Sequence, residues 1–314
     1  MKMYIIIAPI CLTFIFHFCF LSTLVSAISF NKIQLPTNAK GPEALAFELG
    51  TSRFFTGLAD GRILKYQGTT IRFVDFGFAA PNRSKSVCDG TDTSNPNLVC
   101  GRPLGMALHH QTQIQQQRLY VCDAFFGFGV LGPEVHVHQP TGNVYFTDVS
   151  AVYGIRDFET EVSVQDSTGR LLKYDVKSKQ VTVLFRNLSG AAGVAVDEQE
   201  KFALVSEFLA NKTRKIWLQG QRPYRSEIVN SLPRPDNIKR TRLDNFWLAA
   251  ARLDQQMQSN LLPVGVRING NCSVLETVNL ERWYGNKKVT EVQEYGSKLY
   301  IVSRSVNFIG VINY

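Results

Sequence analysis

A pattern of short apolar strands recurs along this chain in a fixed internal order, and it restricts the possible folds more than any other feature of the sequence. Each unit has a first strand, a turn with Gly, Asp or Asn, an apolar second strand, a polar loop and a third strand that carries Lys or Arg. The clearest units lie at 44–66, 142–185, 193–218, 237–251 and 289–312. Apolar residues that alternate at this spacing predict β-strands rather than helices, so we expect a nearly all-β protein.

Units of about 40 to 50 residues cannot bury their own faces, and they are typical of sheets packed radially around an axis. We therefore expect a six-bladed β-propeller with four-stranded antiparallel blades around a central channel. The inner strands are expected to begin near Ala44, Gly105, Val135, Gly193, Asn237 and Val289. The strands at Gly105 and Val135 are only 30 residues apart, whereas the other intervals are 44 to 61 residues, which predicts one incomplete blade. A β-sandwich is the alternative architecture, although sandwiches do not repeat this internal order.

The first 27 residues have the features of a secretory signal peptide. Lys2 precedes an apolar run from Ile5 to Val25, and the small residues Ser26 and Ala27 follow. The run is about long enough to span a bilayer, so an uncleaved anchor is the alternative. We expect residues 1–27 to be removed, residues 28–314 to form the propeller domain, and the mature protein to have no stable membrane association. The oligomeric state stays open.

Cysteines and glycosylation sequons agree with export. Cys88 and Cys100 bracket a short polar segment and are expected to form a disulfide in an oxidising compartment; a bond between Cys122 and Cys272 is a weaker alternative. Four asparagines lie in Asn-x-Ser/Thr sequons within turn-like surroundings, where a glycan could extend into solvent. They are Asn82, Asn187, Asn211 and Asn271.

The net charge of +8 does not indicate a nucleic-acid partner. Lys and Arg are scattered along the chain and form no basic stripe with interleaved aromatic residues. Apolar residues make up 45% of the chain and charged residues 19%, which allows a sizeable core. The expected partner is a small molecule.

Several motifs in a fixed order identify a family. In this sequence they are GRILKY, the Cys88 to Cys100 loop followed by CGRPLG, HQPTGNVYFTDVS, TGRLLKYD, FALVSEF, NIKR and LYIVS. Together they resemble the strictosidine synthase-like proteins of plants, and the resemblance covers nearly the whole chain after residue 27. It implies a six-bladed propeller with its active site in the central channel, often glycosylated and directed to the vacuole, with the cell exterior as the second destination.

The founding activity of that family is a Pictet-Spengler condensation, in which tryptamine and the aldehyde of secologanin give an iminium that the indole carbon attacks. The resemblance implies that Glu291 is the general base, that Phe208 belongs to the substrate pocket, and that Val289 replaces a pocket histidine. It implies no required cofactor.

Strand alternation places Val289, Glu291 and Gln293 on one face. A carboxylate desolvated at a channel wall should have a raised pKa, which suits a general base. The aromatic pair of the amine pocket would fall in the missing stretch after Glu134, which argues against strictosidine synthesis itself.

A second interpretation is a calcium- or zinc-dependent hydrolase of esters and lactones, because related six-bladed propellers include paraoxonases and gluconolactonases. Their metal ligands are partly matched by Glu43, Asp236 and Asn237, whereas Ala192 stands where an Asn is expected. Three protein ligands are few for calcium, which takes six to eight oxygens.

The histidines do not complete a metal site. His109 and His110 adjoin a Gln-rich segment, and His136 and His138 alternate along one strand without a third partner. A third interpretation is a non-catalytic secreted glycoprotein, since a lost segment could open the channel wall.

Overall fold

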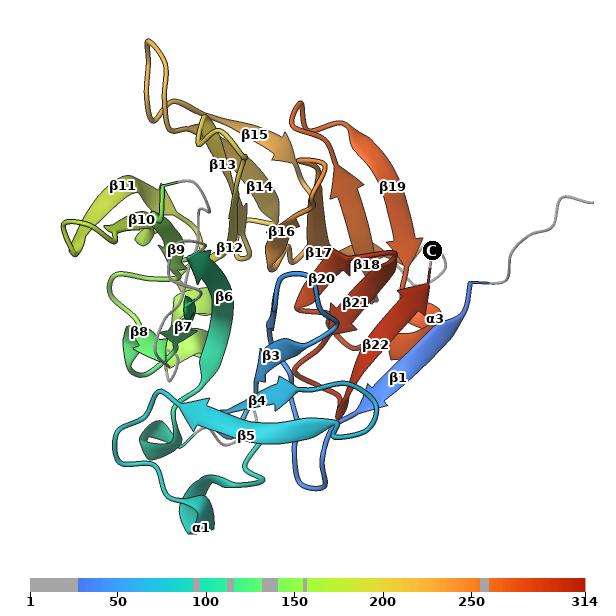
Figure 1. Cartoon of the computed structure of the whole chain (residues 1–314). Coiled ribbons are helices and arrows are strands. Elements are labelled where there is room, and N and C mark those ends of the chain that lie inside the picture. The colour runs from blue at the N-terminus through green and yellow to red at the C-terminus, as the bar shows by residue number, and fades with distance from the viewer. Residues whose placement is uncertain are drawn as a thin grey trace, which may run out of the picture.

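Six small antiparallel sheets form a ring around a common centre (Figure 1). The computed structural model describes residues 28–92, 97–111, 116–131, 141–154, 157–254 and 260–313. The chain is a six-bladed β-propeller, as the repeat of strand units predicts. The blades are numbered here in chain order, and the inner strand of each blade faces the axis.

Four blades contain four strands each. Blade 1 consists of β2 (Leu45–Phe47), β3 (Phe54–Gly57), β4 (Arg62–Tyr66) and β5 (Phe73–Phe78), and blade 4 of β12 (Ala191–Val196), β13 (Phe202–Glu207), β14 (Lys212–Trp217) and β15 (Ser226–Asn230). Blade 5 consists of β16 (Ile238–Arg240), β17 (Phe246–Leu253), β18 (Leu261–Ile268) and β19 (Val274–Asn279). Blade 6 consists of β20 (Glu291–Tyr295), β21 (Lys298–Val302), β22 (Phe308–Asn313) and β1 (Phe30–Gln34). The short helices are α1 (Lys85–Cys88), the 3-10 turn η1 (Leu98–Cys100), α2 (Phe158–Ser163) and α3 (Glu281–Tyr284).

The other two blades contain three strands each within the described residues. Blade 2 is β6 (Pro103–Gln111), β7 (Gln116–Asp123) and β8 (Gly127–Leu131), and blade 3 is β9 (Val144–Asp148), β10 (Gly169–Asp175) and β11 (Gln180–Leu188). The inner strand expected near Val135 lies outside the described residues. Within the described ranges, blades 2 and 3 therefore have one strand fewer than the other four blades; the sequence predicted an incomplete blade in this part of the chain.

The ring is closed by the first strand of the described chain. β1 pairs antiparallel with β22, with Phe30 opposite Ile312 and Gln34 opposite Phe308. Figure 1 shows β1 at the outer side of the last blade, beside the end of the chain. Residues from both ends of the propeller domain thus share one sheet. β1 was not predicted from the sequence, in which the first expected inner strand began near Ala44.

Hydrophobic clusters lie between neighbouring blades all around the ring. Leu35 and Ile309 belong to the cluster between blades 6 and 1, and Leu171 and Ala203 belong to the one between blades 3 and 4. Blades 2 and 3 also contact each other. The Phe128 ring of β8 stacks on the Phe146 ring of β9, with the ring centroids 4.8 Å apart. Blades 2 and 3 are therefore packed against each other through aromatic rings.

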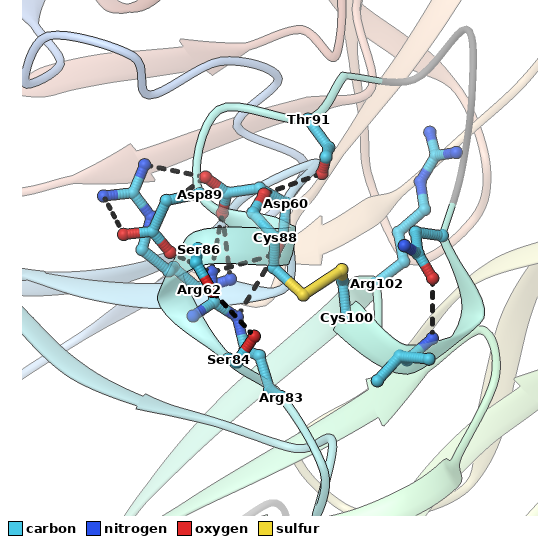
Figure 2. Close-up of a disulfide and its surroundings, with 12 residues drawn as sticks. Asp60, Arg62, Arg83, Ser84, Ser86, Cys88, Asp89, Thr91, Cys100 and Arg102 are labelled. Atoms are coloured by element: carbon cyan, nitrogen blue, oxygen red, sulfur yellow. Dashed lines mark hydrogen bonds and ion pairs between the residues drawn. A yellow bond between two sulfur atoms is a disulfide. The ribbon is translucent and has the colours of Figure 1, made fainter.

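The predicted disulfide between Cys88 and Cys100 is confirmed (Figure 2), with the two sulfur atoms 2.08 Å apart. Beside it, Asp60 pairs with Arg62 at 2.7 Å and accepts a hydrogen bond from the Gly90 amide at 3.0 Å. A side chain at Gly61 would clash, because its Cβ would lie 1.7 Å from the Cys100 carbonyl oxygen. The disulfide loop is thereby fixed against the turn that joins β3 to β4, and the chain passes from it directly into inner strand β6.

The alternative disulfide is wrong, since Cys122 and Cys272 are both free thiols. Burial raises the pKa of Cys122 to about 12, so it is an inert thiol near neutral pH. Within the described residues, no helix has both the length and the apolar character that crossing a membrane requires.

Candidate functional site

The segments that lead into three inner strands are bonded to one another at the centre of the ring. The amide of Asn237, just before β16, donates to the carbonyl oxygen of Thr290, just before β20, at 3.0 Å. The hydroxyl of Thr290 donates in turn to the carbonyl oxygen of Glu43, which precedes β2, at 3.1 Å. Side chains from blades 1, 5 and 6 therefore converge at this end of the channel.

Four ionisable side chains, here called the charged cluster, meet at this point: Glu43, Asp236, Lys288 and Arg304. The Lys288 Nζ is 2.5 Å from Asp236 Oδ2. The Arg304 Nη2 is 3.6 Å from that oxygen and 3.5 Å from Glu43 Oε1. The side chains of Asp236 and Glu43 are both 7% exposed, whereas those of Lys288 and Arg304 are 22% and 33% exposed. The cations are thus the accessible members of the cluster.

Burial changes the proton affinities of the charged cluster. It raises the pKa of Glu43, and the nearby Arg304 opposes this shift. It lowers the pKa of Lys288; the Asp236 carboxylate opposes that shift, while the positive charge of Arg304 adds to it. The Glu43 carboxyl group is therefore harder to ionise than an ordinary glutamate, and the Lys288 ammonium is easier to deprotonate than an ordinary lysine.

Phe208 lies against the charged cluster. It follows β13, and its amide donates to the Gly190 carbonyl oxygen at 2.8 Å. The Lys288 Nζ is 4.0 Å from the centroid of the Phe208 ring, within the range of a cation–π contact. The aromatic residue expected in the substrate pocket thus contacts the Lys288 amine.

Glu291 is the first residue of β20 and is completely buried. Its Oε1 accepts a hydrogen bond from the Leu45 amide at 2.9 Å, and its Oε2 accepts one from Asn237 Nδ2 at 3.3 Å. Burial raises its pKa, and the neighbouring Lys239 is the largest opposing influence. The structure therefore places Glu291 and Asn237 together, next to the backbone of blade 1.

Lys239 joins four blades through its ammonium group. It belongs to β16 of blade 5, and its Nζ is 3.1 Å from Glu291 Oε2 in blade 6. The same atom donates to the carbonyl oxygens of Leu45 in blade 1, at 3.3 Å, and Met106 in blade 2, at 3.4 Å. The side chain is 21% exposed. Sequence reasoning missed this residue, although NIKR was among the family motifs and carries it.

Val289 lies just before β20 and is buried. It is 1% exposed and belongs to a hydrophobic cluster that includes Trp247 and Val292. β20 begins at Glu291, so of the three residues expected to alternate along one strand, Val289 lies outside it. At the position that the resemblance assigns to a pocket histidine, the chain therefore has a core residue.

A glycine allows blades 4 and 5 to approach each other beside the site. A Cβ at Gly193 would lie 2.6 Å from the Asn237 Cα and 2.6 Å from the Asp236 carbonyl oxygen. The Gly193 amide donates to Ser206 Oγ at 2.7 Å, and this hydroxyl donates to the Asp236 carbonyl oxygen at 2.6 Å. The backbone that presents Asp236 and Asn237 is thus held from blade 4.

The metal ligands expected for a hydrolase do not have the arrangement of a metal site. Lys288 and Arg304 pair with the Asp236 carboxylate, and Asn237 directs its Nδ2 toward Glu291. Across the described ranges, no group of three or more His, Cys, Asp or Glu side chains could hold a metal ion. A divalent cation beside Asp236 would meet two positive charges, so this donor set as arranged does not fit calcium or zinc.

The four sequon asparagines Asn82, Asn187, Asn211 and Asn271 are all exposed. None of them lies in the charged cluster. His109 and His110 belong to β6, and His136 and His138 lie outside the described residues.

Sequence comparison finds similarity to plant proteins over nearly the whole chain. The family model described as strictosidine synthase matches residues 133–221. Strictosidine synthase-like protein 11 of Arabidopsis thaliana is 35% identical over 335 residues, which cover 99% of this chain and 99% of that protein. Strictosidine synthase of Catharanthus roseus is 29% identical over 307 residues, covering 90% of this chain and 86% of that protein.

Comparison with solved structures supports the fold alone. A putative gluconolactonase superposes with a TM-score of 0.57 at 12% identity, covering 92% of each chain.

Proposed function

Because this chain belongs to the strictosidine synthase-like family, we propose that it is an enzyme that condenses an amine with a carbonyl compound in its channel. The observation that carries the proposal is the Glu291–Lys239 pair, in which a completely buried carboxylate lies 3.1 Å from the ammonium of a lysine whose side chain is 21% exposed. In such a condensation, amine and aldehyde lose water to form an iminium, a ring carbon attacks it, and a base removes the ring proton.

Glu291 supplies the final proton acceptor in this proposal. Its pKa is raised by burial, which brings it closer to the range where a carboxylate exchanges protons near neutral pH. Because Glu291 is completely buried, Lys239 acts as the relay: it passes one proton to Glu291 Oε2 as it receives the proton leaving the substrate ring. Asn237, 3.3 Å from the same oxygen, keeps the carboxylate oriented.

The charged cluster and Phe208 form the proposed substrate-binding surface. The Phe208 ring offers an apolar wall for an aromatic amine, and aromatic side chains favour stacked or edge-to-face contacts with such groups. Val289 in place of the family's histidine, and the short interval between the inner strands expected at Gly105 and Val135, favour a substrate other than the tryptamine and secologanin pair.

The reaction class is tested with the mature secreted protein and a panel of arylethylamines and aldehydes, with tryptamine plus secologanin included. Mass spectrometry should find a product equal to amine plus aldehyde minus water, formed equally well with and without a chelator. Turnover of aryl esters or lactones that is sensitive to chelation and lost in Glu43→Ala would instead establish the hydrolase. Turnover of none of these compounds would favour a non-catalytic glycoprotein.

We also propose export through the secretory pathway, with the vacuole as the first destination and the cell exterior as the second. The support is that all four sequons are exposed and that β1 begins at Phe30, so cleavage after Ala27 leaves this ring-closing strand intact. Treatment of the plant-expressed protein with an endoglycosidase should increase its electrophoretic mobility. Unchanged mobility would contradict glycosylation at these sites.

A further inference from the structure

Lys288 differs from the neighbouring lysines in its surroundings. Its Nζ lies between a carboxylate oxygen of Asp236, at 2.5 Å, and the face of the Phe208 ring, 4.0 Å from the centroid. The Lys288 side chain as a whole is 22% exposed. Lys287 is the adjacent residue and is exposed.

Asp236 is held rigidly at this position. Its amide donates to the Ala249 carbonyl oxygen at 2.8 Å, and its own carbonyl oxygen accepts from Ser206 at 2.6 Å. The backbone that carries the carboxylate is thereby held, and Asp236 Oδ2 lies 2.5 Å from the Lys288 Nζ. A positioned carboxylate next to an amine is the arrangement in which a proton can leave the amine and return to a leaving group.

The positive charge of Arg304 strengthens this arrangement. Its guanidinium is 3.6 Å from the Asp236 oxygen that also contacts Lys288. Burial lowers the pKa of Lys288 and the positive charge of Arg304 adds to this shift, while the Asp236 carboxylate opposes it. A lysine that is desolvated beside another cationic group is a typical activated nucleophile.

We propose that Lys288 forms a Schiff base with the carbonyl substrate, so that the channel holds this substrate covalently. This inference goes beyond general-base catalysis by Glu291 and rests on the proposed amine–carbonyl function for its biological purpose. The carbonyl compound is an aldehyde small enough to contact Phe208. The amine substrate then replaces Lys288 by exchange at the iminium carbon.

Formation of the Schiff base from Lys288 and the aldehyde requires no further reactant. The Lys288 ammonium gives a proton to Asp236, and the nitrogen lone pair attacks the carbonyl carbon while the carbonyl π electrons move to oxygen. The oxygen takes up the proton from Asp236, which gives a carbinolamine. A proton from the nitrogen then passes through Asp236 to the hydroxyl, which leaves as water. In the net reaction, the Lys288 ammonium and the aldehyde give the protonated iminium and one molecule of water.

Lys239 is a second channel lysine, and its ammonium has different partners from that of Lys288. Its ammonium has three acceptors, Glu291 and the carbonyl oxygens of Leu45 and Met106. A carbonyl addition at this nitrogen would break its hydrogen bonds to the two backbone carbonyl oxygens, which hold blades 1 and 2 to β16. We therefore expect Lys239 to remain unmodified while Lys288 reacts.

The test uses the whole mature protein, benzaldehyde as the carbonyl probe and sodium cyanoborohydride to reduce any imine. Intact-mass measurement should show one benzyl addition, and peptide mapping should place it on Lys288 at a rate at least about tenfold above that of Lys287, as expected for an activated amine. Lys288→Arg, which keeps the charge, should abolish this fast addition. Lys287→Arg is the matched control and should leave it unchanged.

Asp236→Asn provides a second variant in which Lys288 is intact but its proton acceptor is lost. It should slow the addition about tenfold or more, in the range of general acid–base effects. Labelling spread evenly over the surface lysines, or unchanged in Lys288→Arg, would overturn the inference. So would an addition rate in Asp236→Asn equal to that of the wild type.

Failure of this inference is distinguishable from failure of the proposed function. Amine–aldehyde turnover without labelling of Lys288 would remove the Schiff base and keep the condensation. Labelling of Lys288 without any condensation product from the amine panel would keep the covalent capture and remove the proposed reaction.

Discussion

The ammonium of Lys239 lies 3.1 Å from the carboxylate of Glu291 and also donates to backbone carbonyl oxygens of blades 1 and 2. One side chain therefore connects the inner strands of four blades. Because Glu291 is completely buried, the pair is both a structural element of the channel and the part of the site on which the proposed proton transfer depends.

Replacement of Lys239 by Met should destabilise the protein strongly. The change leaves Glu291 buried without its ion-pair partner, and breaking a buried pair in this way costs about 3–5 kcal/mol. Urea unfolding followed by tryptophan fluorescence measures the loss. Glu291→Gln in the Lys239→Met background should recover part of it, because the uncompensated charge is removed. A change within about 0.5 kcal/mol, as for an ordinary surface substitution, would contradict this role.

Gly193→Ala should destabilise the contact between blades 4 and 5. The new Cβ would lie 2.6 Å from the Asn237 Cα, and overpacking of this kind costs about 1–3 kcal/mol. Gly77→Ala is the matched control, because no heavy atom outside its chain neighbours lies within 4 Å of a Cβ at that strand position. Thermal unfolding of both variants is compared with the wild type. An equal melting temperature for all three proteins would contradict this prediction and would show that the backbone at Asn237 shifts to accommodate the added Cβ.

Removal of the Cys88–Cys100 disulfide should lower the free energy of unfolding. The bond closes a segment with a sequence separation of 12, and the loop-entropy account gives about 3 kcal/mol for a loop of this size. The variant Cys88→Ser/Cys100→Ser is compared with the wild type by urea unfolding under non-reducing conditions. Equal midpoints would show that Asp60 and its hydrogen bonds hold the loop without the disulfide.

Several features of this fold were predictable because they depend on local sequence. The alternation of apolar residues defined the strands, and the polar segment between Cys88 and Cys100 indicated a closed surface loop. The ring-closing strand β1 was not predictable in the same way, because its partner β22 lies at the other end of the chain. The five residues of β1 carry no pattern that distinguishes them from an ordinary edge strand.

The charged cluster shows the same limit at the level of the site. Glu43 and Asp236 were recognised as channel residues from family patterns, but their partners Lys288 and Arg304 come from other segments and were not singled out. Only the closed ring brings these four side chains together. Whether a carboxylate binds a metal or a cationic side chain therefore depends on tertiary contacts that sequence spacing does not contain.

Glu161 should make the stability of the fold depend on pH. Burial and the nearby carboxylates of Asp166 and Asp148 raise its pKa from 4.5 to about 7. Between these values the folded state binds more protons than the unfolded state, so this residue makes stability fall as pH rises from about 4.5 through 7. Glu161→Gln should therefore raise the melting temperature at pH 8 and give little gain at pH 5. A gain of equal size at both pH values would contradict the raised pKa.

The central claim is that the buried Glu291 accepts the proton released in an amine–carbonyl condensation. The most direct test is kcat/KM for the amine and aldehyde pair that the wild type condenses, measured for Glu291→Gln and for the control Glu294→Gln on the same strand. We predict a loss of about 100-fold or more for Glu291→Gln, the usual range for a general base, and a change below about threefold for Glu294→Gln. A folded Glu291→Gln variant with the kcat/KM of the wild type would contradict the claim.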